Sequence, residues 1–371
     1  MRSIFQYQNK KGHAQPPRVV VAMSGGVDSS VAAALLVEQG FEVIGMMMRL
    51  WSEPGTGQQN RCCTPDAMAQ AKRVAAQLKI PFYAIDAQEP FYNHVVKYFI
   101  EGYSRGVTPN PCLICNREIR WGLLLNHALA FEAQYMATGH YARLREESGR
   151  IQLLKAVDRS KDQSYVLHVL NQEQLSRAIF PLGEYSKNEV RQFAHRFNLP
   201  VADRPDSQDL CFLGEGDYRA FLKRNSSQDH KSGLIKNHQG EILGEHDGLA
   251  MYTIGQRRGL GLSSPDPLFV LEKDLERNEL VVGTKEELEQ YELSAKDVNW
   301  VSIEPPVEPI RAQVKIRYKS PEEWAVIKPE ENGYAKVKFD RKIISITPGQ
   351  AAVFYDEDIC LGGGIIQTIE R

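Results

Sequence analysis

Two cysteines stand three residues apart in Asn110-Pro111-Cys112-Leu113-Ile114-Cys115, where a turn-rich loop leads into a helix that we expect over 116–131. Cysteines at a helix N-terminus have lowered pKa values, so both thiols are suited to act as nucleophiles or metal ligands. The other four cysteines are Cys62, Cys63, Cys211 and Cys360. They offer no second pair with zinc-ligand spacing, whereas one further thiol would fit an iron–sulfur cluster with an open iron, or sulfur transfer between thiols. A buried structural pair is the simpler alternative.

A second stretch, Ser24-Gly25-Gly26-Val27-Asp28-Ser29-Ser30, joins the apolar run 19–23 to a helix expected over 31–37. A fully apolar run is typical of a parallel strand buried on both faces, and two glycines allow a sharp turn close to a ligand. The helix that follows presents backbone N–H groups and a positive dipole end to an anion. Because neither the Walker pattern nor the G-x-G-x-x-G spacing is present, the stretch predicts a pyrophosphate-binding loop of another type. Asp28 would hold Mg²⁺ there or cap the helix.

The composition indicates a globular protein of more than one domain. The chain has 371 residues, of which 42% are hydrophobic and 25% charged, and a net charge of −2. Any RNA binding must therefore come from local patches. Residues 1–17 lack the apolar core of a secretory signal, and we expect a flexible lead-in, a cytoplasmic protein and no membrane partner. Six cysteines in such a chain favour metal ligands, catalytic thiols or buried small residues over a disulfide framework.

The order of the expected elements predicts an α/β protein with three parts. Strands and helices alternate over 18–212, which is typical of a doubly wound parallel sheet that binds ligands beyond the carboxyl ends of its strands. Short strands around glycines over 213–290 predict a small mixed α/β domain. Alternating stretches punctuated by Pro, Gly and Asn over 291–371 predict a β-barrel. Its expected strands include 311–318, 323–328, 334–339 and 351–355.

A stripe of cations occurs in the expected barrel. Lys315, Arg317 and Lys319 alternate with apolar residues, so a strand over 311–318 would place all three cations on one face. Residues 311–342 hold nine basic side chains against five acidic ones. Such a stripe is usually a solvated strand face, and the alternative is a surface for the RNA backbone.

Many stretches in sequence order carry a specific resemblance that covers the chain from about residue 18 to its end. They are Ser24-Gly25-Gly26-Val27-Asp28-Ser29, Thr108-Pro109-Asn110-Pro111, Cys115-Asn116, Ala137-Thr138-Gly139-His140-Tyr141, Lys161-Asp162-Gln163-Ser164-Tyr165, Cys211-Phe212, Thr253-Ile254-Gly255-Gln256-Arg257, Thr347-Pro348-Gly349-Gln350 and Cys360-Leu361-Gly362-Gly363-Gly364. The sequence resembles the bacterial tRNA-specific 2-thiouridylases, which belong to the N-type ATP pyrophosphatases and place sulfur on C2 of the wobble uridine of tRNA.

The resemblance implies three groups of site residues. The ATP site would be formed by Ala22, Met23, Ser24, Gly25, Gly26, Val27, Asp28, Ser29, Met48 and Gly139. The catalytic thiols would be Cys115 and Cys211. The tRNA would contact Asn110, Pro111, Cys112, His140, Lys161, Asp162, Gln163, Arg317, Tyr318 and Gln350.

One departure from the family pattern leaves two sulfur schemes open. Better-known members carry Asp at the position of Cys112, and their scheme uses Cys211 as a persulfide and Cys115 as the partner that releases sulfur. With Cys112, three soft ligands (Cys112, Cys115 and Cys211) could instead hold a [4Fe-4S] cluster, as in related tRNA thiolases. The expected sulfur donor is a cysteine desulfurase or a sulfur-relay protein.

The chemistry can also be argued from the residues. A carbonyl oxygen is a poor leaving group, so its exchange for sulfur needs activation, and adenylation of the uracil O2 makes AMP the leaving group. A pyrophosphate loop and activated thiols would supply the two halves of that reaction. Two other hypotheses remain. One is an ATP-dependent ligase or amidotransferase that acts on a small molecule and has a structural zinc, and the other is a nucleotide-regulated RNA-binding module without turnover. The first needs no cationic barrel, and the second needs no activated cysteine.

Overall fold

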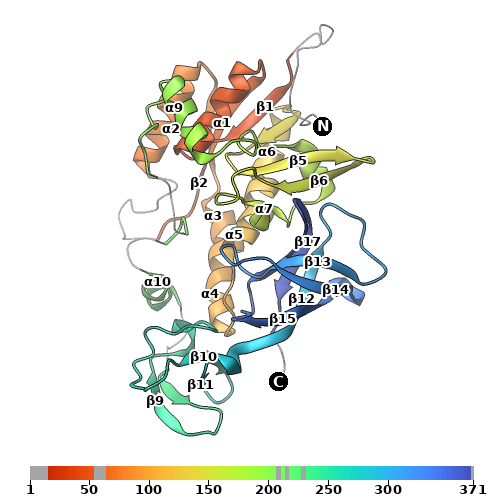
Figure 1. The fold of residues 1–371 in the computed structure, drawn as a ribbon. Coiled ribbons are helices and arrows are strands. Elements are labelled where there is room, and N and C mark those ends of the chain that lie inside the picture. Colours follow the sequence, from red (N-terminus) through yellow and green to blue (C-terminus); the bar gives the residue numbers. More distant parts are fainter. Residues whose placement is uncertain (1–15, 54–63, 206–209, 214–216, 227–230, 369–371) are drawn as a thin grey trace.

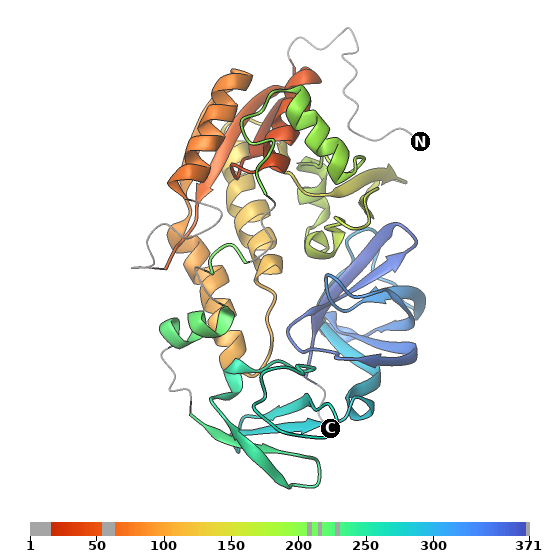
Figure 2. The same ribbon diagram turned by 60° about the vertical axis from the view of Figure 1, so that its left-hand side comes forward.

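The computed structural model describes residues 16–53, 64–205, 210–213, 217–226 and 231–368. Cys62, Cys63 and nearly all of the N-terminal segment that we expect to be flexible lie outside these ranges. A parallel-sheet domain, a small middle domain and a β-barrel follow one another along the chain, as predicted (Figures 1 and 2). No helix in the described ranges is both long enough and apolar enough to cross a lipid bilayer.

The first domain is built on a parallel sheet of five strands in the order β3-β2-β1-β4-β7. The strands are β1 (Arg18–Ala22), β2 (Glu42–Arg49), β3 (Phe82–Asp86), β4 (Tyr135–Ala137) and β7 (Ala178–Ile179). Val19 and Val21 pack on one face and Val20 packs on the other, and all three are fully buried. The apolar run before the loop is therefore a strand covered on both sides.

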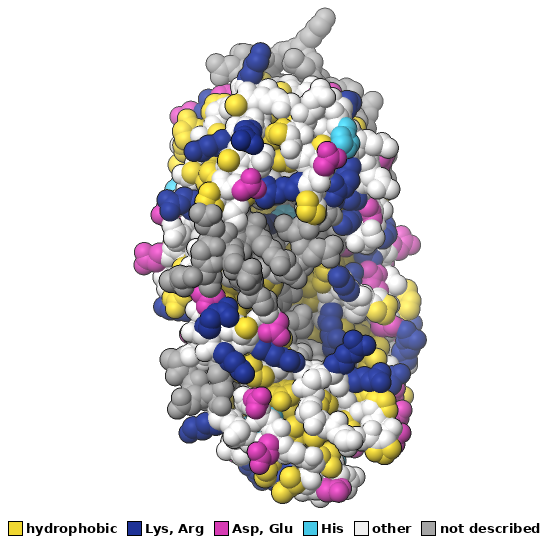
Figure 3. Space-filling view, turned by 90° about the vertical axis from the view of Figure 1, so that its left-hand side faces the viewer, with side chains coloured by type: hydrophobic (Ala, Val, Ile, Leu, Met, Phe, Trp, Pro, Cys, Tyr) yellow, Lys and Arg dark blue, Asp and Glu magenta, His cyan; other side chains and the backbone are white. Residues whose placement is uncertain are grey.

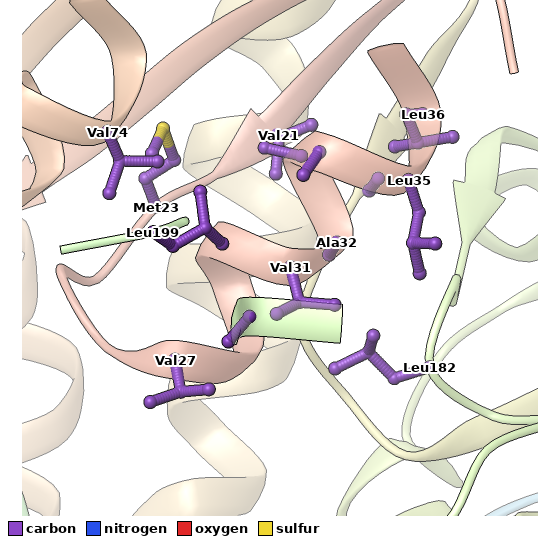
Figure 4. Packing of buried hydrophobic residues seen from close by; sticks show 14 of the residues in the cluster. Val21, Met23, Val27, Val31, Ala32, Leu35, Leu36, Val74, Leu182 and Leu199 are labelled. Carbon is purple, nitrogen blue, oxygen red and sulfur yellow. The ribbon is translucent and has the colours of Figure 1, made fainter. Parts of the chain in front are cut away.

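Helices on the first face support the loop after β1. They are α1 (Val27–Glu38), α2 (Pro65–Leu78) and α9 (Lys187–Arg196). Figure 4 shows Val27 and Val31 of α1 in the same core as Val21 of β1, with Val74 of α2 and Leu199 nearby. Burial of these side chains fixes the direction in which α1 leaves the sheet.

The opposite face is covered by a long helical run made of α5 (Pro111–Ile114), a segment with π geometry, η2 (Cys115–Leu124), and α6 (Leu125–Ala130). A second run, α3 (Gln88–Phe91), η1 (Tyr92–Val96) and α4 (Lys97–Ser104), extends toward the middle domain (Figure 1). Both helical runs were predicted from the sequence, and each observed run begins a few residues before its predicted start. π geometry inside helices is frequent at functional sites.

The barrel is a closed sheet of six strands, because β12 pairs with both β15 and β17. Its strands are β12 (Glu289–Asn299), β13 (Ile310–Lys315), β14 (Glu323–Pro329), β15 (Ala335–Ile344), β16 (Ala351–Asp356) and β17 (Ile359–Ile366). A hairpin from the first half of the chain, β5 (Ala142–Glu147) and β6 (Arg150–Lys155), continues the sheet from β17. Short helices α7 (Ser164–Leu167) and α8 (Gln172–Arg177) follow the hairpin.

The middle domain has a sheet in the order β10-β11-β8-β9. These strands are β8 (Gly233–Lys236), β9 (Ile242–His246), β10 (Phe269–Asp274) and β11 (Glu279–Gly283), and helix α10 (Tyr218–Asn225) precedes them. Single 3₁₀ turns lie at η3 (Leu249–Met251), η4 (Glu286–Leu288) and η5 (Glu331–Gly333), the last of them in the barrel. The domain boundaries at 17, 212 and 290 stay a prediction.

The strand predicted over 311–318 is wrong at its end. β13 stops at Lys315, because Ser320 accepts a hydrogen bond from the Arg317 N–H at 3.1 Å and donates its own N–H to the Arg317 carbonyl at 3.2 Å. These bonds close a turn. Arg317 is half-buried in this turn and Lys319 is exposed, so the three cations do not share one strand face.

Candidate active site

The loop between β1 and α1 is a sharp turn fixed by its own side chains and by α2. Ser29 Oγ accepts a hydrogen bond from the Ser24 N–H at 3.1 Å. Gly25 has a φ of +73°, and a Cβ there would lie 2.2 Å from the Ala67 carbonyl oxygen, so a larger residue would have to displace α2. Gly26 is the N-cap of α1 and gives it no side-chain cap, which leaves the first N–H groups of the helix suited to an anion.

The apolar residues predicted to line the nucleotide site lie at the carboxyl ends of β1 and β2. Met23 and Val27 are buried in the core shared by α1 and α2. Ala22 and Met48 are partly buried and pack on the opposite face of the sheet. Met48 also packs against the apolar cluster that contains Cys115, so the end of β2 touches the surroundings of both predicted centres.

Asp28 is held by two residues from distant parts of the chain. Lys187, the first residue of α9, donates to both carboxylate oxygens of Asp28 at 2.7 and 2.9 Å, and the Tyr141 hydroxyl donates to one of them at 2.7 Å. Gly139 packs directly on this turn, because a Cβ there would lie 2.8 Å from the Ser29 backbone nitrogen. A Mg²⁺ ion at Asp28 would have to displace the ammonium group or share the carboxylate with it.

A second cation at the loop is Arg204, which donates to the Gly25 carbonyl at 3.1 Å and pairs with Asp66 at 3.0 Å. Arg204 and Lys187 place two positive charges beside a loop that is suited to a polyanion. Sequence reasoning missed both residues. The signal for Lys187 was its place just after the capping residue Ser186, at a helix N-terminus on the same face of the sheet as α1, whereas Arg204 follows no motif.

The two cysteines of the C-x-x-C stretch begin the long helical run. Asn110 is the N-cap and accepts a hydrogen bond from the Cys112 N–H at 3.1 Å, and Pro111 occupies the first helical position. Asn116 donates its amide to the Cys112 carbonyl at 3.1 Å and to the Val166 carbonyl at 3.3 Å. These bonds fix the start of the helix against α7.

Cys115 and Cys211 contact the same apolar cluster. Cys115 is buried in it together with Phe212, and Cys211 is half-buried and packs against it. Because Phe212 follows Cys211 directly, its buried ring fixes the backbone next to the second thiol. This cluster also contains Phe99 of α4 and Phe221 of α10, so it joins the first domain to the middle domain.

Cys112 instead lies toward the barrel. Burial raises the pKa of Tyr318, and negative charge on Asp162 and on Cys112 raises it further, so both side chains lie within electrostatic range of that phenol in the barrel. Among the described residues, no three His, Cys, Asp or Glu side chains are arranged to hold a metal ion. Cys112, Cys115 and Cys211 are all described and therefore do not form, in this arrangement, the three-ligand set expected for a [4Fe-4S] cluster.

The segment 161–166 connects the loop 24–29 to the start of the helix that carries Cys112, because Asn116 bonds both the Val166 and the Cys112 carbonyls. Tyr141, whose hydroxyl reaches Asp28, donates its N–H to the Gln163 side chain at 2.9 Å and accepts the Gln163 N–H at 2.8 Å. The neighbouring Asp162 is buried and accepts bonds from the Ser164 hydroxyl at 2.8 Å and the Ala156 N–H at 3.0 Å. The carboxylate of Asp162 thus organises a turn inside the protein, while the adjacent Lys161 is half-buried.

His140 is buried and neutral. Its Nε2 lies 2.8 Å from an Arg120 nitrogen and its Nδ1 lies 2.7 Å from the Thr138 hydroxyl. Burial, and next the charge of Arg120, hold the pKa of His140 well below its usual range. Because a guanidinium only donates, Nε2 must accept from Arg120 and Nδ1–H must donate to Thr138. His140 is therefore suited to shape a pocket rather than to move a proton.

Two predicted tRNA residues of the barrel make contacts within the protein. Arg317 donates to the Ser345 carbonyl and to the Thr347 hydroxyl, the latter at 2.9 Å. Gln350 donates to the Thr108 carbonyl at 2.9 Å. Cys360, the remaining described cysteine, is fully buried, and burial raises its pKa well above the usual range, so its thiol is not suited to be a nucleophile.

The order of domains defines a class of protein, and family models match each part. The "tRNA methyl transferase HUP domain" matches residues 17–215, the "tRNA methyl transferase PRC-barrel domain" matches 219–284 and the "Aminomethyltransferase beta-barrel domain" matches 290–366. The chain is thus an α/β protein with a parallel-sheet HUP domain and two appended β domains.

Relatives along the whole chain give the particular family. A tRNA-specific 2-thiouridylase from Caldanaerobacter subterraneus subsp. tengcongensis is 50% identical over 359 residues, covering 95% of this chain and 99% of the relative. Another from Symbiobacterium thermophilum is 47% identical over 375 residues, covering 98% and 95%. The chain belongs to the family of tRNA-specific 2-thiouridylases, which are tRNA sulfurtransferases.

Likeness to solved structures is remote. A 4-thiouridine synthetase in complex with RNA and ATP is 14% identical, with a TM-score of 0.36 over 56% of this chain and 50% of the other.

Proposed function

We propose that this protein uses ATP to replace the C2 oxygen of the wobble uridine of tRNA with sulfur. Family membership supports the reaction, and one observation supports its location. Tyr141 contacts Asp28 of the pyrophosphate loop and is bonded to Gln163, and the nearby Val166 carbonyl shares the Asn116 amide with the Cys112 carbonyl. Nucleotide activation and thiol chemistry can therefore act on one base.

The first step is adenylation. ATP would bind with its phosphates at the N-terminus of α1 and the loop 24–29, where Lys187 and Arg204 offset negative charge. Asp28 would hold Mg²⁺, whose charge would offset the negative charge that develops on pyrophosphate. The uracil O2 attacks the α-phosphorus, the bond to pyrophosphate breaks, and C2 then carries AMP as its leaving group.

The second step transfers sulfur between thiols. The terminal sulfur of a persulfide on Cys211 attacks C2, and AMP leaves with the former O2. The thiolate of Cys115 then attacks Sγ of Cys211, which forms a Cys115–Cys211 disulfide and leaves the second sulfur on C2. Cys115 and Cys211 contact the same group of apolar side chains, which supports a disulfide between them. The iron–sulfur scheme needs Cys112 as a third ligand, and the three thiols do not form such a ligand set among the described residues.

The balance of this step requires a partner and a reductant. One sulfane sulfur must be delivered to Cys211 in each cycle, which a cysteine desulfurase or a sulfur-relay protein can do by persulfide exchange. Two electrons from a dithiol must then reduce the Cys115–Cys211 disulfide.

The RNA would lie across the face between the sheet domain and the barrel. Figure 3 shows Lys and Arg side chains gathered on both sides of the middle of one face, although the net charge is −2. Such local concentration is what binding of a phosphate backbone needs. A wobble base must leave its stack to reach the buried thiols, so extrusion of the base is part of the proposal.

The test is nucleoside mass spectrometry of tRNA after incubation of the full-length protein with ATP, Mg²⁺, a persulfide donor and a dithiol. We expect 2-thiouridine with the wild type, and none with Cys115→Ser or Cys211→Ser. Cys360→Ser is the matched control, because that buried thiol has no part in the scheme. Absence of 2-thiouridine with the wild type and a competent donor would overturn the proposal.

Cys112→Ala separates the two sulfur schemes. The disulfide scheme predicts that this variant still forms 2-thiouridine, because Cys115 and Cys211 remain. The cluster scheme predicts complete loss, together with loss of iron from anaerobically reconstituted protein. The small-molecule ligase is not favoured by the comparisons, because the relatives that match along the whole chain are tRNA-specific 2-thiouridylases.

A further inference from the structure

Three segments from different domains meet at the start of the helical run α5–η2, which carries Cys112 and Cys115. They are the loop 108–111, the turn 253–256 of the middle domain and the segment 345–350 of the barrel. Thr108 lies at their centre. Its N–H donates to the Pro348 carbonyl at 2.8 Å, its carbonyl accepts from the Gln350 side chain at 2.9 Å, and its hydroxyl lies 3.4 Å from the Thr253 hydroxyl.

Glycines allow the close approach at this junction. Gly349 has a φ of +91°, and a Cβ there would lie 2.8 Å from the Thr108 carbonyl oxygen and 3.0 Å from its nitrogen. Gly102 of α4 closes the other side, because a Cβ there would lie 2.7 Å from Pro109 Cγ. The loop 108–111 is therefore packed closely between α4 on one side and the barrel on the other.

Gly255 allows a close approach between the middle domain and the barrel. Gly255 has a φ of +83°, and a Cβ there would lie 2.3 Å from Ser345 Oγ and 2.7 Å from Ser345 Cβ. The turn around Gly255 is fixed on β10, since Gly255 donates its N–H to the Val270 carbonyl at 2.8 Å. Ser345 in turn is tied to Arg317, which donates to its carbonyl.

The position of Thr108 determines where the thiols lie. Three residues lie between it and Cys112, and two of them, Asn110 and Pro111, are the N-cap and first residue of the helix. The pyrophosphate loop has different supports, α2, α9 and the stretch after β4, none of which touches the junction through the bonds described above.

We propose that Gly349, Gly255 and Gln350 are positioning residues for the sulfur step. Gly349 and Gln350 act on Thr108 directly, and Gly255 acts through Ser345 of the same barrel segment. Together they place Cys112 and Cys115 from outside the parallel-sheet domain, while nucleotide binding is independent of them. The inference deepens the proposed function and rests on it for the meaning of the sulfur step, but the placement of the thiols can be measured without RNA or ATP.

The test uses the full chain with Gly349→Ala and Gly255→Ala. Controls are Gly240→Ala and Gly261→Ala, which have similar φ values of +83° and +71° but no atom within 4 Å of the added Cβ. The first readout is the rate of alkylation of Cys112 and Cys115 by iodoacetamide, followed by peptide mass spectrometry. We expect this rate to change several-fold in the two junction variants and to match the wild type in the controls.

The second readout is activity. A displacement of about 1 Å at a reacting group costs about 100-fold in rate, so we expect a fall of that order in kcat for thiolation, with the Kd for ATP unchanged. Gln350→Ala, which adds no atom, should show a smaller change in the same direction and guards against misfolding of the glycine variants. Ser345→Gly removes the atoms that Gly255→Ala would strike, so the double variant should recover both readouts.

Alkylation rates equal to those of the controls in folded Gly349→Ala and Gln350→Ala would overturn the inference. So would a loss of ATP affinity equal to the loss of kcat, which would mean general damage. If the wild type forms no 2-thiouridine, the proposed function fails, whereas the alkylation readout still decides whether the junction places the thiols.

Discussion

The Asp28–Lys187 pair joins the start of α1 to the start of α9, and its removal tests whether the pyrophosphate loop is held as described. The Lys187 side chain is 11% exposed and Asp28 is 34% exposed, with two nitrogen–oxygen distances of 2.7 and 2.9 Å. Charged hydrogen bonds contribute about 1.5–3 kcal/mol when buried and about 0–1 kcal/mol at the surface. Because Lys187 is largely buried and Asp28 is partly exposed to solvent, we expect a coupling free energy of about 2 kcal/mol between them.

The assay is a double-mutant cycle in urea with Asp28→Asn, Lys187→Met and the double variant. A matched pair exists at the other end of the same two helices, where Arg196 and Glu38 lie 2.8 Å apart but are 50% and 51% exposed. That cycle, with Arg196→Met and Glu38→Gln, should give less than about 1 kcal/mol. Equal coupling in the two cycles would refute the view that burial makes the first pair hold the loop.

The same variants test the nucleotide site. Lys187→Met leaves the Asp28 carboxylate with the Tyr141 hydroxyl and without the ammonium group, so its charge would face the phosphates of ATP. We expect the Kd for ATP, measured by calorimetry without Mg²⁺ so that the ion cannot replace the ammonium group at Asp28, to rise, while Glu38→Gln leaves it unchanged. An unchanged Kd for Lys187→Met would remove Lys187 from the nucleotide site.

Three further changes have defined outcomes. Gly25→Ala should abolish ATP binding because its Cβ would strike the Ala67 carbonyl, whereas Gly149→Ala, at a φ of +78° with open space, should cost only about 1 kcal/mol in urea unfolding. Burial lowers the pKa of His168 to about 4, so the unfolded chain binds more protons between pH 4 and 6.5; His168 should account for about 3 kcal/mol of the stability lost over that fall in pH, and His168→Gln should lose about that much less than the wild type. Burial lowers the pKa of Lys273 to about 7, and its amino group has no hydrogen-bond partner among the described residues. Stability of the wild type should therefore rise from pH 7 to pH 9 in chemical unfolding, and Lys273→Met should be more stable at pH 7 and lack that rise.

Local chemistry made some elements predictable from the sequence. The run 19–23 is apolar at every position, and only a strand buried on both faces suits it, which the packing of Val19 and Val20 on opposite faces confirms. The capping box at Ser186 likewise marks the start of α9, because its side chain bonds the backbone of the first turn. Such signals depend on neighbours within a few residues.

Other features depend on contacts between distant residues and gave no sequence signal. Lys187 meets Asp28 across 159 positions, and Arg204 meets Gly25 across 179. Arg317 looked like one member of an alternating strand, but its backbone bonds to Ser320 end that strand and turn its side chain toward Ser345. Alternation predicts a strand face only where the backbone stays extended, and a serine three residues away was enough to prevent it.

The attachment of the barrel limits how RNA binding can act on the active site. β6 pairs with β17 in the register Cys360↔Leu153, so one sheet runs from the barrel into the segment that follows Tyr141. Lys155, whose side chain is 9% exposed, adds an ion pair to Glu322 at 2.6 Å. Rotation of the barrel would break both the strand pairing and this largely buried pair, whose separation leaves a charge without its partner. RNA bound to the barrel, as we propose, would therefore lie at a fixed distance from the pyrophosphate loop.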